Sequence, residues 1–191
     1  MSGGFRLLTG RLILRRFHES DLEAFLAYRN DPEVARYQSW TSWSREEGEA
    51  FLARQRDLEP GTPGEWTQIA LERREAPGLI GDCAVKVQAE DPRQAEIGFS
   101  LAPAWQGHGY GTEAVTALLG HLFGTLGLHR VIAVTDAENA ASAALLERAG
   151  MRREGHLVEN VWFKGVWGSE YLYAILEREW RDHASSVTST S

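Results

Sequence analysis

The chain has 191 residues, of which 43% are apolar and 25% charged, and this composition excludes disorder over most of its length. A chain of this size forms one domain by default, because domains usually run to about 100–200 residues. Twenty Lys and Arg against 27 Asp and Glu give a net charge of −7. That balance argues against a general nucleic-acid binder, since such a protein needs a basic surface.

The chain also lacks the marks of a membrane or exported protein. No apolar run approaches the roughly 18–20 residues of a membrane span, and the first four residues show no basic-then-apolar export signal. The lone Cys83 cannot form an internal disulfide, which favours a reducing compartment. We therefore expect a cytoplasmic protein in which Cys83, inside a predicted strand, is a small core residue.

The first half of the chain predicts strands interrupted by two helices. Two capping boxes, in which a Ser and a Glu three residues later bond exposed backbone N–H groups, begin helices at Ser20 and Ser44. Turn residues stop the first helix near 30–32 and the second near 60–61. Alternating or apolar runs predict strands over 11–17, 66–73, 79–87 and 95–101.

The second half opens with the strongest helical pattern in the chain. One apolar stripe runs over three turns through Val115, Leu118, Leu119, Leu122, Phe123 and Leu126. The apolar run 131–134 is typical of a strand buried on both faces. A helix over 140–149 follows, with Asn139 as its N-cap and Gly150 as its left-handed stop. Strands over 152–163 and 171–176 close a single domain over 1–183, and the polar tail 184–191 is expected to be disordered.

The segment from Gln106 to Thr112 carries the most functional information. Its three alternate glycines precede the best helix, so backbone N–H groups can converge there on an anion. The alternative interpretation is a Gly-rich turn that has no binding role. A nucleotide-hydrolase phosphate loop needs a Lys that this segment lacks. A dinucleotide-binding fingerprint fits 109–114, but that motif requires its glycines directly after the strand. Here Pro103 and five more residues lie between the strand and Gly109.

A third pattern fits better, since Gln106-x-x-Gly109-x-Gly111 matches the pyrophosphate motif of acyl-CoA-dependent N-acetyltransferases. The chain resembles the GNAT superfamily over nearly its whole length, within the branch of ribosomal-protein N-terminal (alanine) acetyltransferases. Five segments in the correct order carry that resemblance: Thr9-Gly10-Arg11-Leu12-Ile13-Leu14-Arg15, Glu96-Ile97-Gly98-Phe99, Gly109-Tyr110-Gly111-Thr112-Glu113-Ala114, Asn139 with Ser142 through Gly150-Met151, and Tyr173-Ala174-Ile175-Leu176 with Glu179-Trp180.

The resemblance implies an α/β (α+β) GNAT fold, with a mixed sheet of about seven strands flanked by about four helices. The sheet would splay at an acetyl-CoA site, where the cofactor pairs with a strand edge. Glu113 would be a first-turn carboxylate that stabilises its helix through the dipole. The implied cofactor-binding residues are Phe99, Ser100, Leu101, Gln106, Gly107, His108, Gly109, Tyr110, Gly111, Thr112, Asn139 and Ser142.

The resemblance also implies catalytic roles. Ser142 would point its hydroxyl at the thioester sulfur, and the Tyr that many relatives carry four residues later is Leu146 here. Glu96 is our candidate for a water-relayed base. Some relatives use a carboxylate in the strand after Gly150, where this chain has Val161.

The acceptor site of the resembled fold is lined by the first two helices and the last hairpin. The candidate acceptor-binding residues in those stretches are Tyr37, Trp40, Trp43 and Trp162, with Trp167 beside them. The acidic net charge favours a cationic amine. Scattered His residues and one Cys predict no metal site.

The sequence thus predicts direct acetyl transfer from acetyl-CoA to a primary amine in a ternary complex, with a protein or peptide N-terminal α-amine as the leading acceptor. A small amine, an amino acid or an antibiotic is the alternative acceptor. A non-catalytic acyl-CoA sensor and a dinucleotide-binding oxidoreductase are rival functions. No nucleic acid or membrane partner is expected, and a homodimer is one assembly that we consider.

Overall fold

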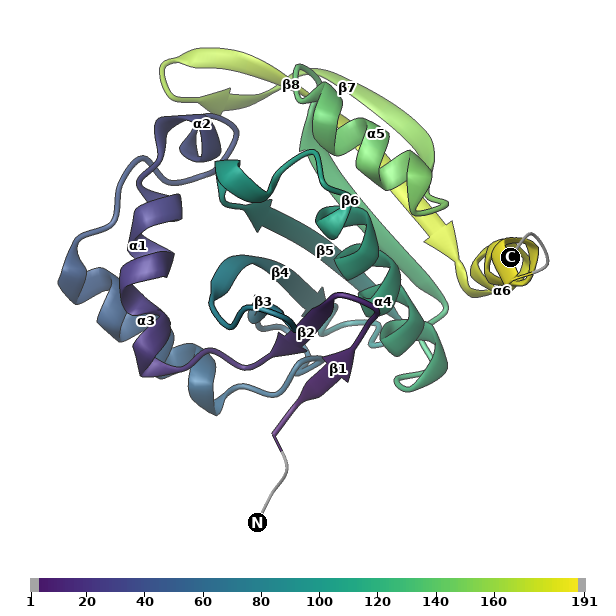
Figure 1. The fold of residues 1–191 in the computed structure, drawn as a ribbon. Coiled ribbons are helices and arrows are strands. Elements are labelled where there is room, and N and C mark those ends of the chain that lie inside the picture. The colour runs from purple at the N-terminus through teal and green to yellow at the C-terminus, as the bar shows by residue number, and fades with distance from the viewer. Residues whose placement is uncertain (1–3, 189–191) are drawn as a thin grey trace.

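The computed structural model describes residues 4–188, and side chains as far as residue 183. Eight strands form one sheet in the order β1-β2-β3-β4-β5-β6-β8-β7 (Figure 1). The strands are β1 (Arg6–Leu8), β2 (Leu12–Arg15), β3 (Thr67–Arg73), β4 (Leu79–Val87), β5 (Gln94–Leu101), β6 (Arg130–Asp136), β7 (Arg152–Phe163) and β8 (Val166–Leu176). The helices are α1 (Leu22–Arg29), α2 (Pro32–Ala35), α3 (Arg45–Asp57), α4 (Tyr110–Gly124), α5 (Ala140–Arg148) and α6 (Glu177–Thr188).

The expected mixed α/β fold is confirmed, with more elements than the sequence predicted. The strand expected over 11–17 is one arm of a hairpin, because β1 pairs antiparallel with β2. The short helix α2 begins where the Asp31 side chain accepts a hydrogen bond from the N–H of Glu33 and Pro32 fills the first turn. Helix α6 continues the chain beyond β8. Its backbone is helical as far as Thr188, within the tail 184–191 for which the sequence predicts disorder, and 189–191 lie outside the described residues.

One of the two predicted capping boxes is confirmed. The Ser44 side chain accepts a hydrogen bond from the N–H of Glu47, whose carboxylate accepts one from the N–H of Ser44. The prediction at Ser20 is wrong, because a 3₁₀ turn over Glu19–Asp21 precedes α1. There the Asp21 carboxylate accepts a hydrogen bond from the N–H of His18 at 2.7 Å and pairs with Arg15, so Asp21 takes the part expected of Glu23, with His18 as the N-cap.

Two further details of the predicted core differ from the structure. Leu126 lies beyond the end of α4 and is 39% exposed, whereas the rest of the predicted stripe is buried. Strand β6 is fully buried on one face only, through Val131 and Ala133, because Ile132 and Val134 point to the more open face of the sheet. Cys83 is fully buried as expected, and burial raises the pKa of its thiol.

Helices cover both faces of the sheet (Figure 1). Ile69 and Leu71 of β3 join the larger core under α4 and α5, while Ala70 between them joins a smaller core under α1 and α3. This alternation is the period of two expected of a strand covered on both sides.

A buried ion pair anchors α1 to the sheet. Arg29 on α1 donates to Asp82 on β4 at 2.8 Å, and their side chains are 4% and 2% exposed. The hydroxyl of Tyr28 donates to the other Asp82 oxygen at 2.6 Å. Burial works to lower the pKa of Arg29, but the charges and hydrogen bonds of Asp82 and Tyr28 together outweigh burial and the pKa is raised.

The sheet splays between its two central strands. β5 and β6 form the one parallel pair of the described sheet, and their pairing ends at Ile97 and Ala133. β5 nevertheless runs on to Leu101 and β6 to Asp136, each still paired along its outer edge with β4 or β8. A gap therefore opens between the two strands at their carboxyl ends.

We predict that Asp82→Asn lowers the free energy of unfolding by about 3–5 kcal/mol, because it leaves the Arg29 guanidinium buried without a counter-charge. Urea unfolding measures the loss. The triple variant Tyr28→Phe, Arg29→Met, Asp82→Leu should recover most of it, since both charges and the hydroxyl that bonds them leave together. A single variant as stable as the wild type would contradict the anchoring role.

Candidate active site

The backbone of β5 faces the gap at its last residues. The N–H of Ala102 bonds the carbonyl of Ile80 on β4 at 2.9 Å. Because successive residues of a strand direct their backbone groups to opposite edges, Phe99 and Leu101 direct theirs toward the gap. The Gln106 side chain donates to the carbonyl of Leu101 at 2.9 Å, so the loop after β5 is held to this edge.

A cleft of about 590 Å³ begins at this edge and extends along the loop to α5; we call it the loop cleft. Ten of the twelve residues predicted to bind the cofactor line it: Phe99, Ser100, Leu101, Gln106, Gly107, Gly109, Gly111, Thr112, Asn139 and Ser142. His108 and Tyr110 do not line it. Arg148 at the end of α5 does, and sequence reasoning missed it because a single Arg in the last helical turn also suits the helix dipole.

The glycines of the loop have two different structural reasons. Gly107 and Gly109 have φ of 77° and 80°, the left-handed region that other residues adopt at a cost. A Cβ on Gly111 would instead lie 2.5 Å from Cδ1 of Leu145. Gly111 therefore allows α4 to pack against α5, which corrects our view of it as only a site of backbone approach to an anion.

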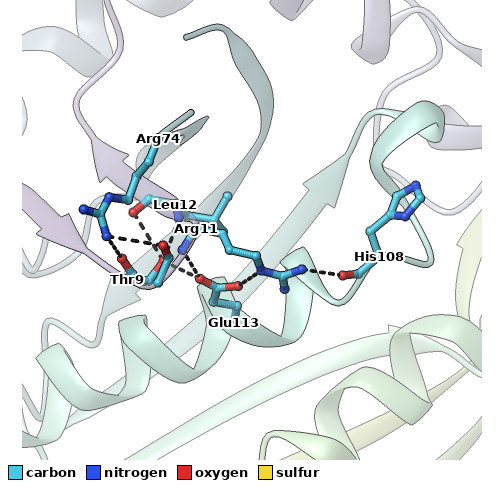
Figure 2. A network of polar contacts seen from close by, with 7 residues as sticks. Thr9, Arg11, Leu12, Arg74, His108 and Glu113 are labelled. Carbon is cyan, nitrogen blue, oxygen red and sulfur yellow. Dashed lines mark hydrogen bonds and ion pairs between the residues drawn. The ribbon is translucent and has the colours of Figure 1, made fainter. Parts of the chain in front are cut away.

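A network of polar contacts ties the loop to the β1–β2 turn (Figure 2). The Glu113 carboxylate on α4 accepts hydrogen bonds from the Thr9 hydroxyl at 2.6 Å and the Arg11 N–H at 2.8 Å, and pairs with Arg11 Nε at 2.7 Å. The same guanidinium donates to the carbonyl of His108 at 3.0 Å and lies 4.5 Å from the ring centre of Tyr110. In Figure 2 the His108 imidazole points away from this network.

Glu113 thus does more than complement the helix dipole. Burial works to raise its pKa, but the hydrogen bonds from Thr9 and Arg11 outweigh burial and the pKa is lowered. The carboxylate is therefore charged at neutral pH, and its contribution to stability is lost only as the pH falls through this lowered pKa. Through Arg11 it holds the main chain of the glycine loop.

A second cavity, of about 250 Å³, lies in the gap between β5 and β6; we call it the gap cavity. It meets the loop cleft at Phe99, Asn139 and Ser142, which line both. Asn139 caps α5 as predicted, accepting a hydrogen bond from the N–H of Ser142 at 3.0 Å. Leu146, where many relatives carry Tyr, lines the gap cavity with an apolar side chain.

Two carboxylates line the gap cavity, Asp136 on β6 and Glu170 on β8. The predicted base Glu96 does not line it, although burial and the charge of Glu170 raise its pKa against the opposing effect of Lys86. Glu170 accepts a hydrogen bond from the Asn160 side chain at 2.5 Å.

A carboxylate near the Val161 position therefore does exist, but the neighbouring strand supplies it. Val161 on β7 lines the gap cavity, while Glu159 lies in a bulge with φ 47° and does not. Glu170 could not be predicted from the sequence, because its place at the cavity depends on the register of β6, β7 and β8.

The predicted acceptor aromatics fall into two groups. Tyr37 lines both the loop cleft and the gap cavity. Trp40 and Trp43 line a third cavity of about 380 Å³, beside the gap cavity. Trp162 and Trp167 stack edge to face on the β7–β8 hairpin, 60% and 58% exposed, and line none of these cavities.

Among residues 4–188, no three His, Cys, Asp or Glu side chains come together to hold a metal ion. None of the helices described there is long and apolar enough to cross a membrane.

A splayed sheet with a glycine loop at the splay defines an acyl-CoA-dependent transferase fold, and comparison with known proteins identifies the family. A model described as an acetyltransferase (GNAT) domain matches residues 11–152. The chain is 33% identical over 174 residues to YnaD of Bacillus subtilis, named an uncharacterized N-acetyltransferase, which covers 91% of this chain and 98% of that one. A GNAT-family acetyltransferase structure from Bacillus anthracis has a TM-score of 0.82 at 29% identity, covering 91% and 99%.

A shorter match is to the ribosomal protein uS5-alanine N-acetyltransferase of Escherichia coli, 32% identical over 84 residues, or 44% of this chain and 43% of that one. The chain belongs to the GNAT acetyltransferases and is an N-acetyltransferase. The acetyl donor of this family is acetyl-CoA, and the residues present fit it: a free strand edge for the pantetheine amides, and a glycine loop and Arg148 for the phosphates.

We predict that Glu113→Gln raises the Kd for acetyl-CoA about three- to tenfold, or about 0.7–1.4 kcal/mol, because Arg11 loses the carboxylate that aims it at the loop. Isothermal titration calorimetry measures the Kd. Arg74→Gln is the matched control, since Arg74 bonds the carbonyl of Thr9 in the same network but has no bond to the loop. Equal affinity in the wild type and Glu113→Gln would show that the network does not position the loop.

Proposed function

We propose that the acceptor is a primary α-amine of a peptide or protein N-terminus, acetylated by direct transfer in a ternary complex. The observation that carries this proposal is the meeting of the two cavities at Phe99, Asn139 and Ser142, with the carboxylates of Asp136 and Glu170 in the gap cavity. A thioester in the loop cleft and an amine in the gap cavity would meet at Ser142.

The pKa of the acceptor's amino group favours an α-amine over a Lys side chain. An α-amine with a pKa of about 7.7–8.0 is roughly one-tenth neutral at pH 7, whereas a Lys amine at about 10.4 is neutral in about one molecule in 2,500. An α-amine therefore needs only an exit for its proton rather than a strong base. The partial relative that acts on the alanine of a ribosomal protein supports the same class.

In our proposal Glu170 accepts the proton of the amine, and Glu96 is the next proton acceptor. Glu170 lines the cavity and attracts the ammonium form of the amine, which it can relieve of a proton directly or through a water. Glu96 is close enough for the charge of Glu170 to help raise its pKa, which makes Glu96 a better proton acceptor at neutral pH. Glu96 thus keeps the water-relayed role predicted for it, one step from the amine.

Ser142 acts on the leaving group in this proposal. Its hydroxyl would donate to the thioester sulfur as negative charge develops there, a contact that strengthens in the transition state. Leu146 offers no proton, so Ser142 or a water protonates the thiolate. Both Ser142 and the glycine loop come from this chain. The cytoplasmic location stays a prediction, and a homodimer stays one assembly that we consider.

The test measures free thiol release from acetyl-CoA with three acceptors: a Lys-free peptide with a free N-terminus, an N-blocked peptide with one Lys, and spermidine. We expect the first to give the highest kcat/KM, rising with pH through the pKa of the α-amine. Ser142→Ala should lower kcat and kcat/KM together by about ten- to a hundredfold, or about 1.4–2.7 kcal/mol, with the Kd for acetyl-CoA unchanged.

Preference for the Lys peptide or for spermidine would overturn the α-amine assignment in favour of the alternative acceptors. Acetyl-CoA binding without thiol release for any amine would favour a sensor. A normal kcat in Ser142→Ala would remove the hydroxyl from the mechanism.

A further inference from the structure

The third cavity lies beside the gap cavity, between the 37–44 loop and the sheet, and five aromatic side chains line it: Trp40, Trp43, Phe51, Trp66 and Phe99. We call it the aromatic cavity. It shares Gln38, Ser39, Gly98 and Phe99 with the gap cavity, so a molecule in one can extend into the other.

Two small residues, Ala84 and Gly98, leave open space on the sheet side of the aromatic cavity. Gln68 on β3 pairs with Ala84 on β4, which pairs with Gly98 on β5, so the three lie in one row across the sheet. A Cβ on Gly98 would lie 3.8 Å from the Cβ of Ala84, an ordinary contact. A larger side chain at Gly98 fits the backbone but would narrow the passage between the two cavities.

Two polar atoms of cavity-lining residues are buried without a partner. Within the described part of the chain, neither Nε1 of Trp43, a donor, nor Oε1 of Gln68, an acceptor, has a hydrogen bond. Buried polar atoms of native proteins are nearly always bonded, so a bound group is the natural partner for both. A carboxamide or peptide unit carries both an acceptor for the Trp43 donor and a donor for the Gln68 acceptor.

The charges on the two cavities differ. The aromatic cavity has Arg29 and Asp82 as its only titratable lining residues, and these pair with each other at 2.8 Å. The face of Trp40 is already covered by the Arg29 guanidinium, 4.0 Å from the ring centre. The gap cavity instead carries the carboxylates of Asp136 and Glu170. A cation is favoured in the gap cavity and an uncharged group in the aromatic cavity.

We propose that the aromatic cavity binds the uncharged arm of the acceptor, a planar group containing an amide, while the amine of the same molecule lies in the gap cavity. This inference rests on the proposed acetylation of an amine in the gap cavity. It narrows the acceptor class to amines that carry a flat amide-linked group, and it disfavours polyamines, whose second cation would enter a cavity without a free carboxylate.

The test compares two acceptors, alanine 2-naphthylamide, which carries an amide and a flat ring, and n-butylamine, which carries neither. Trp43→Phe removes the Nε1 donor but keeps a ring, and Gly98→Val narrows the passage. Trp167→Phe is the matched control, because Trp167 is 58% exposed and lines none of the cavities. Circular dichroism and thermal melting verify that each variant folds.

The wild type should prefer the naphthylamide, and the ratio of the two kcat/KM values should fall at least tenfold in Trp43→Phe and in Gly98→Val but not in Trp167→Phe. Quenching of tryptophan fluorescence by the naphthylamide gives its Kd without catalysis, and this Kd should rise in the same two variants. Equal ratios and equal Kd values in all four proteins would overturn the inference and leave the proposed acetylation standing. Naphthylamide binding that weakens in the two variants, with no acetylation of either amine, would support the aromatic cavity and overturn the proposed function.

Discussion

The early end of pairing between β5 and β6 is the constraint on which the rest of the structure depends. Parallel strands that stayed paired to their ends would fill the gap with their own hydrogen bonds. Here the pairing stops at Ile97 and Ala133, and the outer edges hold each strand in place through β4 and β8. The gap therefore has rigid walls, free backbone groups on one side and carboxylates from β6 and β8 on the other.

In our proposal the loop after β5 makes this gap a site for acetyl-CoA, a thioester that carries phosphate groups. Gly107 and Gly109 let the main chain turn left-handed before α4, and Gly111 lets α4 approach α5. Arg11 lies in a turn about a hundred residues earlier in the chain. Its guanidinium, paired with Glu113, donates to the main chain of the loop and fixes it. This contact joins an Arg near the N-terminus to a Glu after the glycine loop in one network.

Local sequence patterns predicted much of the fold but only part of the candidate site. The stripe on α4, the Ser44 box and the Asn139 cap are set by neighbours in sequence, so their periodicity and spacing predicted them. The Ser20 box failed because Asp21, held by Arg15, bonds the N–H of His18 and begins a 3₁₀ turn two residues before the predicted cap. The glycine loop could be predicted because its three alternate glycines lie within one short segment of the chain. Glu170 could not, since it reaches the gap only through the pairing of β8 with β6, and periodicity carries no information on that register.

The most direct test of this account is amide hydrogen exchange on β5, measured by NMR with and without saturating acetyl-CoA. Backbone groups of Phe99 and Leu101 face the gap, whereas those of Gly98 and Ser100 face β4, to which β5 stays paired. The account predicts that acetyl-CoA slows exchange of the Phe99 and Leu101 amides at least tenfold and leaves Gly98 and Ser100 little changed. Unchanged exchange at Phe99 and Leu101 in the saturated protein would show that the splayed edge of β5 does not bind the acetyl donor.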